Sequence, residues 1–472
     1  MQTDCTSSLF SFQDLGGKRV VGNFDGGAIS SDAGALILRE LEHATGIIKA
    51  FANCFTDYRE KGYIEHTVEE LVSQRVFGIC LGYEDLNDHD SLRKDPVLAA
   101  VCGKLDVSGE NRRQNRDKGN PLAGKSTLNR LETSGGTSLF THRYKKITVN
   151  QTMVEMFLVN AFLDSFEQPP EEIILDLDAT DDPIHGEQEG RFFHGYYDCY
   201  CYLPLYIFSG DHLLCAKLRP SNIDASAGAE MELARIVTQI RERWPHVRII
   251  ARADSGFCRE AIMSWCEGND VDFLFGIAKN RRLLRKIRKE LCESRRQCLS
   301  TGLPQRRYAE LMYRTKKTWS RSRRVVAKAE YLLKGENPRF IVTSLPQGRF
   351  PAQALYEELY CARGDMENRI KEQQLFLFAD RTSSATMRAN QLRLWFSSVA
   401  YLIMSALRRI ALKGTELATA QCDTIRLKVL KIGAQVRLSV RRLYVSFASG
   451  YPYQELFRQA VIRIRMVSFQ TG

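Results

Sequence analysis

The chain has 472 residues, of which 44% are hydrophobic and 26% charged, a globular composition that excludes a disordered or collagen-like protein. Its formal net charge of +11 favours a polyanionic partner. The longest strongly apolar run, residues 394–407, is shorter than the roughly 18–20 residues that cross a bilayer, so we expect a buried helix there and no membrane-spanning segment.

The N-terminal part of the chain is predicted to be mainly helical. Apolar residues recur at helical spacing over residues 31–55, 67–82 and 149–166, and a polar loop over residues 111–126 separates the second of these segments from the third. We expect residues 1–165 to form a helical DNA-binding region, although no helix-turn-helix motif is evident. No cationic stretch leads into an apolar core at the start of the chain, so we expect a cytoplasmic, nucleoid-associated protein without a secretory signal.

Strands and helices alternate over residues 166–285, which we predict to be the first part of an α/β core. Residues 173–180 form a buried strand that ends in acidic residues, and the next two strands, over 199–210 and 212–221, are joined by a short turn. The elements that follow are a helix, a buried strand, a second helix and a last strand: 227–244, 247–256, 259–268 and 271–278. Three antiparallel strands followed by α/β units are typical of an RNase H-like mixed sheet flanked by helices.

Residues 286–350 are predicted to be a basic, β-rich insertion, with strands over 325–333 and 338–345. Between residues 279 and 328, 18 Lys and Arg residues stand against three Glu residues, so the excess of this window is larger than that of the whole chain. Such a charge density needs counter-charge, most simply phosphates. A solvated helix face is the alternative.

A long helix from about residue 353 returns the chain to the core. We assign residues 351–412 to the second part of the core, and residues 413–472 to a basic C-terminal region. Two alternating segments in that last region, 435–443 and 461–467, are predicted to be strands with arginines on one face.

Three acidic residues fall at corresponding places in this topology. Asp178 ends the first core strand, Asp254 ends a later strand parallel to it, and Glu367 lies on the late helix. Because neighbouring parallel strands end at the same edge of a sheet, we expect these side chains to meet. Close carboxylates repel one another unless a cation screens them, so two divalent ions such as Mg²⁺ are the natural occupants. Two such ions support in-line displacement at a phosphodiester.

Each of these acids also has a plainer explanation. An Asp at a strand end is often a turn or cap residue, and Glu367 could pair with Arg363 or Lys371, four residues away on either side. Asp176 lies two residues before Asp178 on the same strand face and is an alternative ligand. We favour Asp178 because it is nearer the end of the strand.

One face of the late helix carries polar side chains around the acid. They are Tyr360, Arg363, Glu367, Lys371 and Gln374. A phenol, a guanidinium and an amine beside a metal-binding carboxylate suit a helix that grips backbone phosphates. The alternative is an ion-paired surface helix.

Several segments together resemble one family. They are LDLDATDD, HGEQEGRFFHGYYDCYCYLPLYIF, LRPSNIDASAGA, RADSGF and YCARGDMENRIKEQQL. With them the chain resembles a DDE-type insertion-sequence transposase, specifically the insertion-sequence thirteen-eighty group, from about residue 10 to the C-terminus. The resemblance implies cleavage at transposon-end inverted repeats and strand transfer of the 3′-hydroxyl into target DNA. It further implies Asp178, Asp254 and Glu367 as the triad, with two Mg²⁺ ions that Mn²⁺ can replace.

The resemblance has one departure and suggests one further residue. The helix signature Y-x2-R-x3-E-x6-K is met at its first three positions, but Gln374 stands where Lys is expected, and Lys371 lies one turn earlier. Related enzymes use an insertion Trp to stack on a flipped base, for which Trp319 is the candidate; a Trp in the core of the insertion is the alternative. The cations around it, which we also assign to DNA binding, are Lys316, Lys317, Arg321, Arg323 and Arg324.

The expected partner is double-stranded DNA, both transposon ends and target. Because two centres must act on two ends, we expect a homodimer in the synaptic complex. His194 could approach the scissile phosphate, with hydrogen bonding within its loop as the alternative. Two other functions compete with the transposase: an RNase H-like nuclease without strand transfer, and a domesticated DNA-binding regulator.

Overall fold

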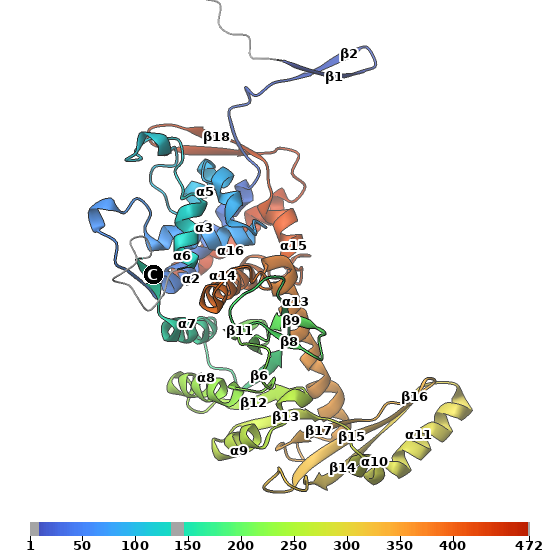
Figure 1. Ribbon diagram of the computed structural model, residues 1–472. Helices are drawn as coiled ribbons and strands as arrows, with labels where there is room; N and C mark the ends of the chain where they lie inside the picture. The colour runs from blue at the N-terminus through green and yellow to red at the C-terminus, as the bar shows by residue number, and fades with distance from the viewer. Residues whose placement is uncertain (1–8, 134–145, 471–472) are drawn as a thin grey trace, which may run out of the picture.

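The computed structural model describes residues 9–133 and 146–470, which form a mixed α/β protein around one large sheet (Figure 1). The order of hydrogen-bonded strands is β11-β10-β6-β12-β13-β17-β15-β14, with β16 paired to β15. Their bounds are β6 Glu172–Ala179, β10 Leu205–Ser209, β11 His212–Lys217, β12 Arg248–Ala253, β13 Asp272–Ile277, β14 Gln305–Tyr313, β15 Arg323–Leu332, β16 Gly335–Glu336 and β17 Arg339–Thr343.

The first half of the sheet has the strand order that the sequence predicts. Strands β6, β10 and β11 are consecutive antiparallel neighbours, whereas β12 and β13 run parallel to β6. Helices α8 (Ala229–Arg243) and α9 (Glu260–Gly268) connect the parallel strands. All residues of β12 after Arg248 are buried, as expected of a central parallel strand covered on both faces.

The prediction of one strand over residues 199–210 is wrong. The segment forms two strands, β9 (Cys199–Tyr202) and β10, which belong to different sheets. Strand β9 pairs with β7 (Asp182–Pro183) and β8 (Phe192–His194). Pro204 lies between the two strands, and because proline has no N–H to donate, it interrupts the ladder there.

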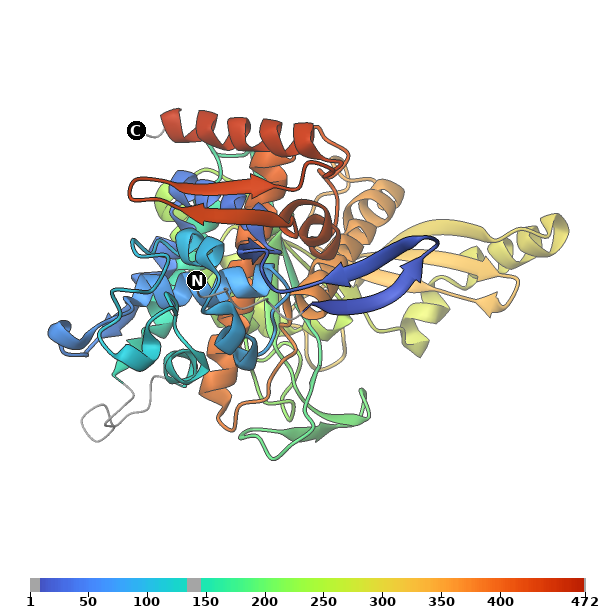
Figure 2. The same cartoon turned by 90° about the horizontal axis from the view of Figure 1, so that it is seen from above.

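The insertion between β13 and the late helix extends the central sheet. It contains α10 (Arg281–Lys286) and α11 (Arg288–Thr301) besides strands β14 to β17. Strand β17 pairs antiparallel with β13, and this pairing joins strands β14 to β17 to the central sheet. The predicted strands over 325–333 and 338–345 are confirmed. Figure 2 shows the insertion, in yellow, projecting from the side of the molecule.

The late helix is one continuous helical run with a changed pitch in its first part. It comprises α12 (Ala352–Ala354), a π-helical segment over Leu355–Tyr360, a 3₁₀ turn over Cys361–Arg363, and α13 (Gly364–Leu377). π-helical turns often occur at functional sites. The predicted helix from about residue 353 is confirmed.

The helices of the N-terminal part are α1 Leu36–Thr45, α2 Ile47–Ala52, α3 Val68–Cys80, α4 His89–Leu92, α5 Pro96–Val101, α6 Lys125–Glu132 and α7 Gln151–Leu163. Four of them, α1, α2, α3 and α6, pack against α14 (Met387–Ala406). The α3 helix begins with a capping box between Thr67 and Glu70, which satisfies free N–H groups at its first turn. Every residue of α14 from Leu394 onwards is buried, as predicted, and among the described residues no helix is long and apolar enough to cross a membrane.

The C-terminal part closes onto the beginning of the chain. Strands β18 (Ala434–Leu438) and β19 (Leu443–Phe447) form a sheet with β3 (Ala28–Ser30), and α16 (Gln454–Gln470) packs against α1. One apolar core, which we call the shared core, therefore joins residues 33–158 with residues 366–464. Further elements are β4 Phe55–Asp57, paired with β5 Ile147–Val149, the helix α15 Cys422–Ile425, and the hairpin β1 Phe10–Leu15 with β2 Lys18–Gly22.

The strand predicted over residues 461–467 is wrong, because this segment belongs to α16. Its buried residues are Ala460 and Ile464, four positions apart on one helix face. An alternation of apolar and basic residues over seven positions also places apolar residues at helical spacing, so the short segment fits both periods. The prediction of one strand over 435–443 is also wrong beyond its first half: β18 ends at Leu438, and the chain turns before β19 begins at Leu443.

Candidate active site

Asp178 and Asp254 are brought together by the register of two parallel strands. In the pairing of β6 with β12, Asp176 lies opposite Arg252 and Leu177 opposite Ala253. Asp178 follows Leu177 on β6, and Asp254 follows Ala253 directly after the end of β12, so both acids lie at the same edge of the sheet. The charge of Asp254 contributes to the raised pKa of Asp178, as expected of neighbouring carboxyl groups. The Asp254 backbone then turns, and its Oδ1 accepts a hydrogen bond of 2.8 Å from the Gly256 N–H.

Both predicted partners of Asp178 affect the pKa of its carboxyl group. Burial raises the pKa of the Asp178 carboxyl to about 7, Arg363 opposes this rise, and the charges of Asp254 and Glu367 add to it. A carboxylate beside two others is expected to hold its proton more tightly. The Asp178 carboxyl is therefore buried beside two other acids, with Arg363 as the nearby positive charge.

Glu367 is turned toward an arginine on its own helix. Its Oε1 accepts a hydrogen bond of 2.7 Å from Nη2 of Arg363, one turn earlier. Within the described part of the chain, no three His, Cys, Asp or Glu side chains are close enough to hold a metal ion. The structure thus unites Asp178 with Asp254 and brings Glu367 near them, with Arg363 as the counter-charge of all three.

Asp176, the alternative to Asp178, is held in a buried ion pair. Both of its oxygens accept hydrogen bonds from Arg252, at 2.5 Å from Nε and 2.7 Å from Nη2. Arg252 also donates to the carbonyl oxygen of Leu359 in the π-helical segment. Asp176 therefore ties the sheet to the late helix.

A glycine that the sequence analysis missed lies against Asp254. A Cβ atom on Gly276 of β13 would stand 2.6 Å from the hydroxyl of Tyr360 and 2.9 Å from the backbone nitrogen of Ser255. Only a residue without a side chain lets the chain after Asp254 cross β13 this closely. A glycine inside a predicted strand often marks such an approach, which was the available signal. Burial raises the pKa of Tyr360, and the charge of Asp254 adds to this effect.

Gln374 connects the late helix to the segment after β6. Its Nε2 donates to the Asp181 carbonyl oxygen at 3.1 Å and to Oδ1 of Asp182 at 2.9 Å. Asp182 is fully buried, and this burial raises its pKa to about 8. Lys371 is exposed and forms no ion pair with any described residue.

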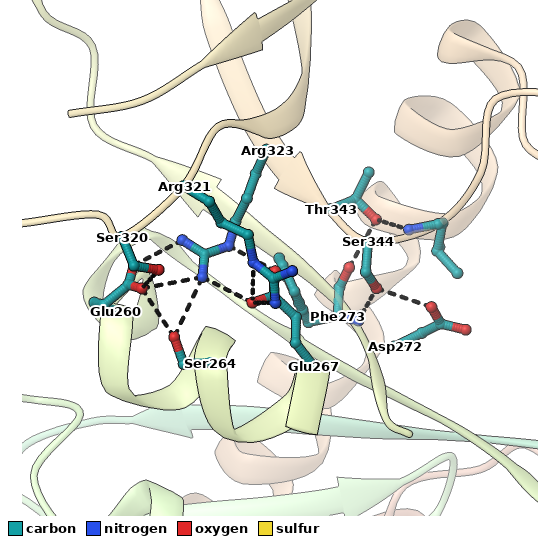
Figure 3. Close-up of polar contacts among 11 residues, drawn as sticks. Glu260, Ser264, Glu267, Asp272, Phe273, Ser320, Arg321, Arg323, Thr343 and Ser344 are labelled. Atoms are coloured by element: carbon teal, nitrogen blue, oxygen red, sulfur yellow. Dashed lines mark hydrogen bonds and ion pairs between the residues drawn. The ribbon is translucent and has the colours of Figure 1, made fainter. Parts of the chain in front are cut away.

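The predicted DNA-binding arginines of the insertion are engaged within the protein. Arg323 is buried and pairs with Glu260 and Glu267 of α9, each at 2.7 Å, and Arg321 pairs with the same Glu267 (Figure 3). Arg324 forms a two-pronged pair with Glu310, at 3.1 and 2.9 Å.

Trp319 lies in the core of the insertion. Its side chain is 5% exposed, its ring meets that of Tyr313 edge-on at 5.7 Å, and Arg323 lies over it at 5.6 Å. In this conformation the ring has no free face for a base. Lys316 and Lys317, in contrast, are exposed.

His194 lies on β8, close to the end of β6. Its ring is 4.9 Å from that of Tyr197, whose hydroxyl donates to the Ala179 carbonyl at 3.3 Å. The Nδ1 atom of His194 is buried and has no hydrogen-bond partner among the described residues.

Comparison with known proteins identifies the family. A family described as "Transposase DDE domain group 1" matches residues 12–469, nearly the whole chain. The chain belongs to this transposase DDE domain family. A search among curated proteins found no match to it. Membership of the DDE transposases supports a DNA transposase role, and hence an enzyme that acts on DNA.

Proposed function

We propose that this DDE transposase cleaves DNA at transposon-end inverted repeats and transfers the 3′-hydroxyl into target DNA. The observation that carries the proposal is the register of β6 and β12, which sets Asp178 beside Asp254 at one edge of the sheet. The order of three antiparallel and two parallel strands supports an RNase H-like core. Asp178, Asp254 and Glu367 are the proposed catalytic triad.

The carboxylates at this edge fit a pair of divalent cations. Mg²⁺ and Mn²⁺ prefer carboxylate oxygens as ligands. Asp178 lies near Asp254 and Glu367, whose charges both raise its pKa. Such ions, when bound, would activate the attacking hydroxyl or water and neutralise the departing oxygen. Glu367 would then exchange its contact with Arg363 for a place at the edge.

That exchange releases Arg363 for the substrate. Its guanidinium is bonded to Glu367 at 2.7 Å, and the charge of Asp178 also acts on it. Once Glu367 has moved, the planar donor group is free to bind two oxygens of a backbone phosphate. Arg363 is thus proposed to orient the DNA strand beside the acids.

The finer identity of the enzyme is part of the same proposal. We place it in the insertion-sequence thirteen-eighty group, acting on two transposon ends as a homodimer. Residues 1–165 and the basic insertion, residues 286–350, are proposed to contact the DNA, with Lys316, Lys317 and Lys371 as exposed cations in reach of phosphates.

The decisive experiment compares two Asp-to-Asn variants on a duplex that carries the terminal repeat. With Mg²⁺ or Mn²⁺, Asp254→Asn should lower the cleavage rate by more than about 100-fold while DNA binding is retained. Asp270→Asn is the matched control, because Asp270 is an exposed loop residue, and its rate should equal that of the parent. Equal cleavage by Asp254→Asn and the parent would disprove the assignment.

The products separate the competing functions. Joined donor–target molecules are expected of a transposase. Cleaved ends without joined products would indicate an RNase H-like nuclease, and binding without cleavage a domesticated regulator.

A further inference from the structure

The first described residues form a projecting hairpin that we call the N-terminal arm, residues 9–27. Strands β1 and β2 pair only with each other and stand away from the body of the molecule (Figure 1). All residues of β1, and all of β2 except Gly22, are exposed. None of the arm's side chains belongs to the hydrophobic clusters formed by the described residues.

One face of the arm is apolar. The register places Phe12 opposite Val20 and Phe10 opposite Gly22, so these side chains share a face. Phe24 meets Phe10 edge-on at 5.3 Å and is itself 94% exposed. A single two-stranded hairpin is at best marginally stable in water, and contiguous exposed apolar surface marks interaction sites. The arm is therefore expected to be covered in the working protein.

The charge of the arm argues against DNA as the covering partner. The arm carries Asp14 and Asp25 against Lys18 and Arg19, so its charges cancel. Surfaces that bind DNA are strongly basic, because they must neutralise phosphates. An aromatic face on a segment without net charge is better matched by another apolar protein surface.

We propose that the arm packs against the arm of a second copy of this chain. A surface that meets itself across a two-fold axis needs no other partner, and the open edges of β1 and β2 also allow strand pairing between copies. The area fits a weak contact of this kind. Phe10, Phe12 and Phe24 are 44%, 61% and 94% exposed, so at roughly 200 Å² per side chain they offer about 400 Å² per arm and about 800 Å² for two arms. This is below the range of stable interfaces, so we expect a transient dimer that dissociates on dilution.

The test measures the mass of the purified full chain by sedimentation over a concentration series, without DNA or added metal. The parent should pass from monomer to dimer as its concentration rises. The variant Phe10→Ser/Phe12→Ser/Phe24→Ser should remain monomeric over the same range. The matched control, Met231→Ser/Leu299→Ser/Leu333→Ser, removes exposed apolar side chains elsewhere and should dimerise like the parent.

Folding is checked independently, because the arm contributes nothing to the described hydrophobic clusters. Both triple variants should have the thermal unfolding temperature of the parent monomer. A parent that is monomeric at every concentration would overturn the proposal, and so would a dimer that survives the three arm substitutions. If the arm variant keeps the mass of the parent but binds the terminal-repeat duplex more weakly in a separate titration, the proposal is overturned and the arm is assigned to DNA. Cleavage activity is not measured, so these outcomes are independent of the proposed reaction.

Discussion

The acidic edge of the sheet and the basic insertion differ in how their charges are balanced. At the edge, Asp178 lies beside Asp254 and near Glu367, and a single arginine, Arg363, offsets these acids. In the insertion, the buried Arg323 contacts two glutamates, Glu260 and Glu267. At the edge one arginine faces three acids, whereas glutamates of α9 and β14 balance several arginines of the insertion.

This difference changes how net charge is interpreted as a sign of function. The excess of cations over residues 279–328 suggested a DNA surface, yet Arg321, just before β15, and Arg323 and Arg324, at its start, bind acids of α9 and β14. Charge that is satisfied inside the protein stabilises the fold, and only the remainder is available to a ligand. In the insertion that remainder includes Lys316 and Lys317, and on α11 the exposed Arg288 and Lys289.

The strongest test of the comparison is to remove Arg323. Arg323→Met should lower the free energy of unfolding by about 3 kcal/mol, because it leaves Glu260 and Glu267 without their buried partner. Arg321→Met is the control: it touches the same Glu267 from an exposed position, so its effect should stay within about 1 kcal/mol. Denaturant unfolding measures both. Equal effects of the two substitutions would show that burial does not distinguish these arginines.

The acidic edge can be disturbed without changing any charge. In Gly276→Ala the new methyl group would meet the Tyr360 hydroxyl and the Ser255 nitrogen, which should cost about 1–3 kcal/mol of unfolding free energy and reduce cleavage. Gly268→Ala is the control, since no atom lies within 4 Å of its Cβ position. Adding Tyr360→Phe to Gly276→Ala should restore part of the stability. If Gly276→Ala unfolds like the parent, the backbone after Asp254 is not confined by β13.

A third prediction concerns the buried carboxyl of Asp182 and how the free energy of unfolding depends on pH. Because burial raises the pKa of Asp182 to about 8, the folded state keeps this proton when the unfolded state has lost it. The free energy of unfolding should therefore fall by about 1.4 kcal/mol per pH unit from this group, between about pH 5 and about pH 8. Asp182→Asn removes that term while keeping an oxygen for Gln374.

Denaturant unfolding across this pH range compares Asp182→Asn with the parent. The variant should gain stability relative to the parent as the pH rises. Parallel curves would mean that Asp182 is ionised in the folded protein.

The smallest effect on stability is expected at the exposed lysines. Lys316→Ala/Lys317→Ala should change the free energy of unfolding by less than about 0.5 kcal/mol. If both lysines contact phosphates, the dependence of DNA affinity on the logarithm of salt concentration should decrease by about 2. An unchanged salt dependence would place the DNA elsewhere on the protein.

Much of the fold follows from local sequence patterns. The buried runs of β6, β12 and β13 and the helices between them are predictable, because apolar periods extend over whole elements there. The errors occur where a pattern is short or interrupted. Pro204 divides a strand run, and residues 461–467 are too few to distinguish a strand from the helix α16.

The candidate site was predictable only where topology determines proximity. Parallel strands end at one edge, so the meeting of Asp178 and Asp254 follows from the strand order alone. The partners of Arg323 cannot be predicted from the strand order, because Glu260 and Glu267 lie more than 50 positions earlier on a different element. Nor does the sequence reveal that Gln374 holds Asp182, since that contact depends on how the late helix packs.

The shared core has a consequence for how the protein is made. Helices of residues 33–158 bury their apolar faces against α14 and α16, which leave the ribosome last. At about 5–20 residues per second, the first helices wait tens of seconds before their packing partners have been synthesised. A polypeptide that terminates before α14 thus leaves that apolar surface in water, where it is a substrate for chaperones and proteases.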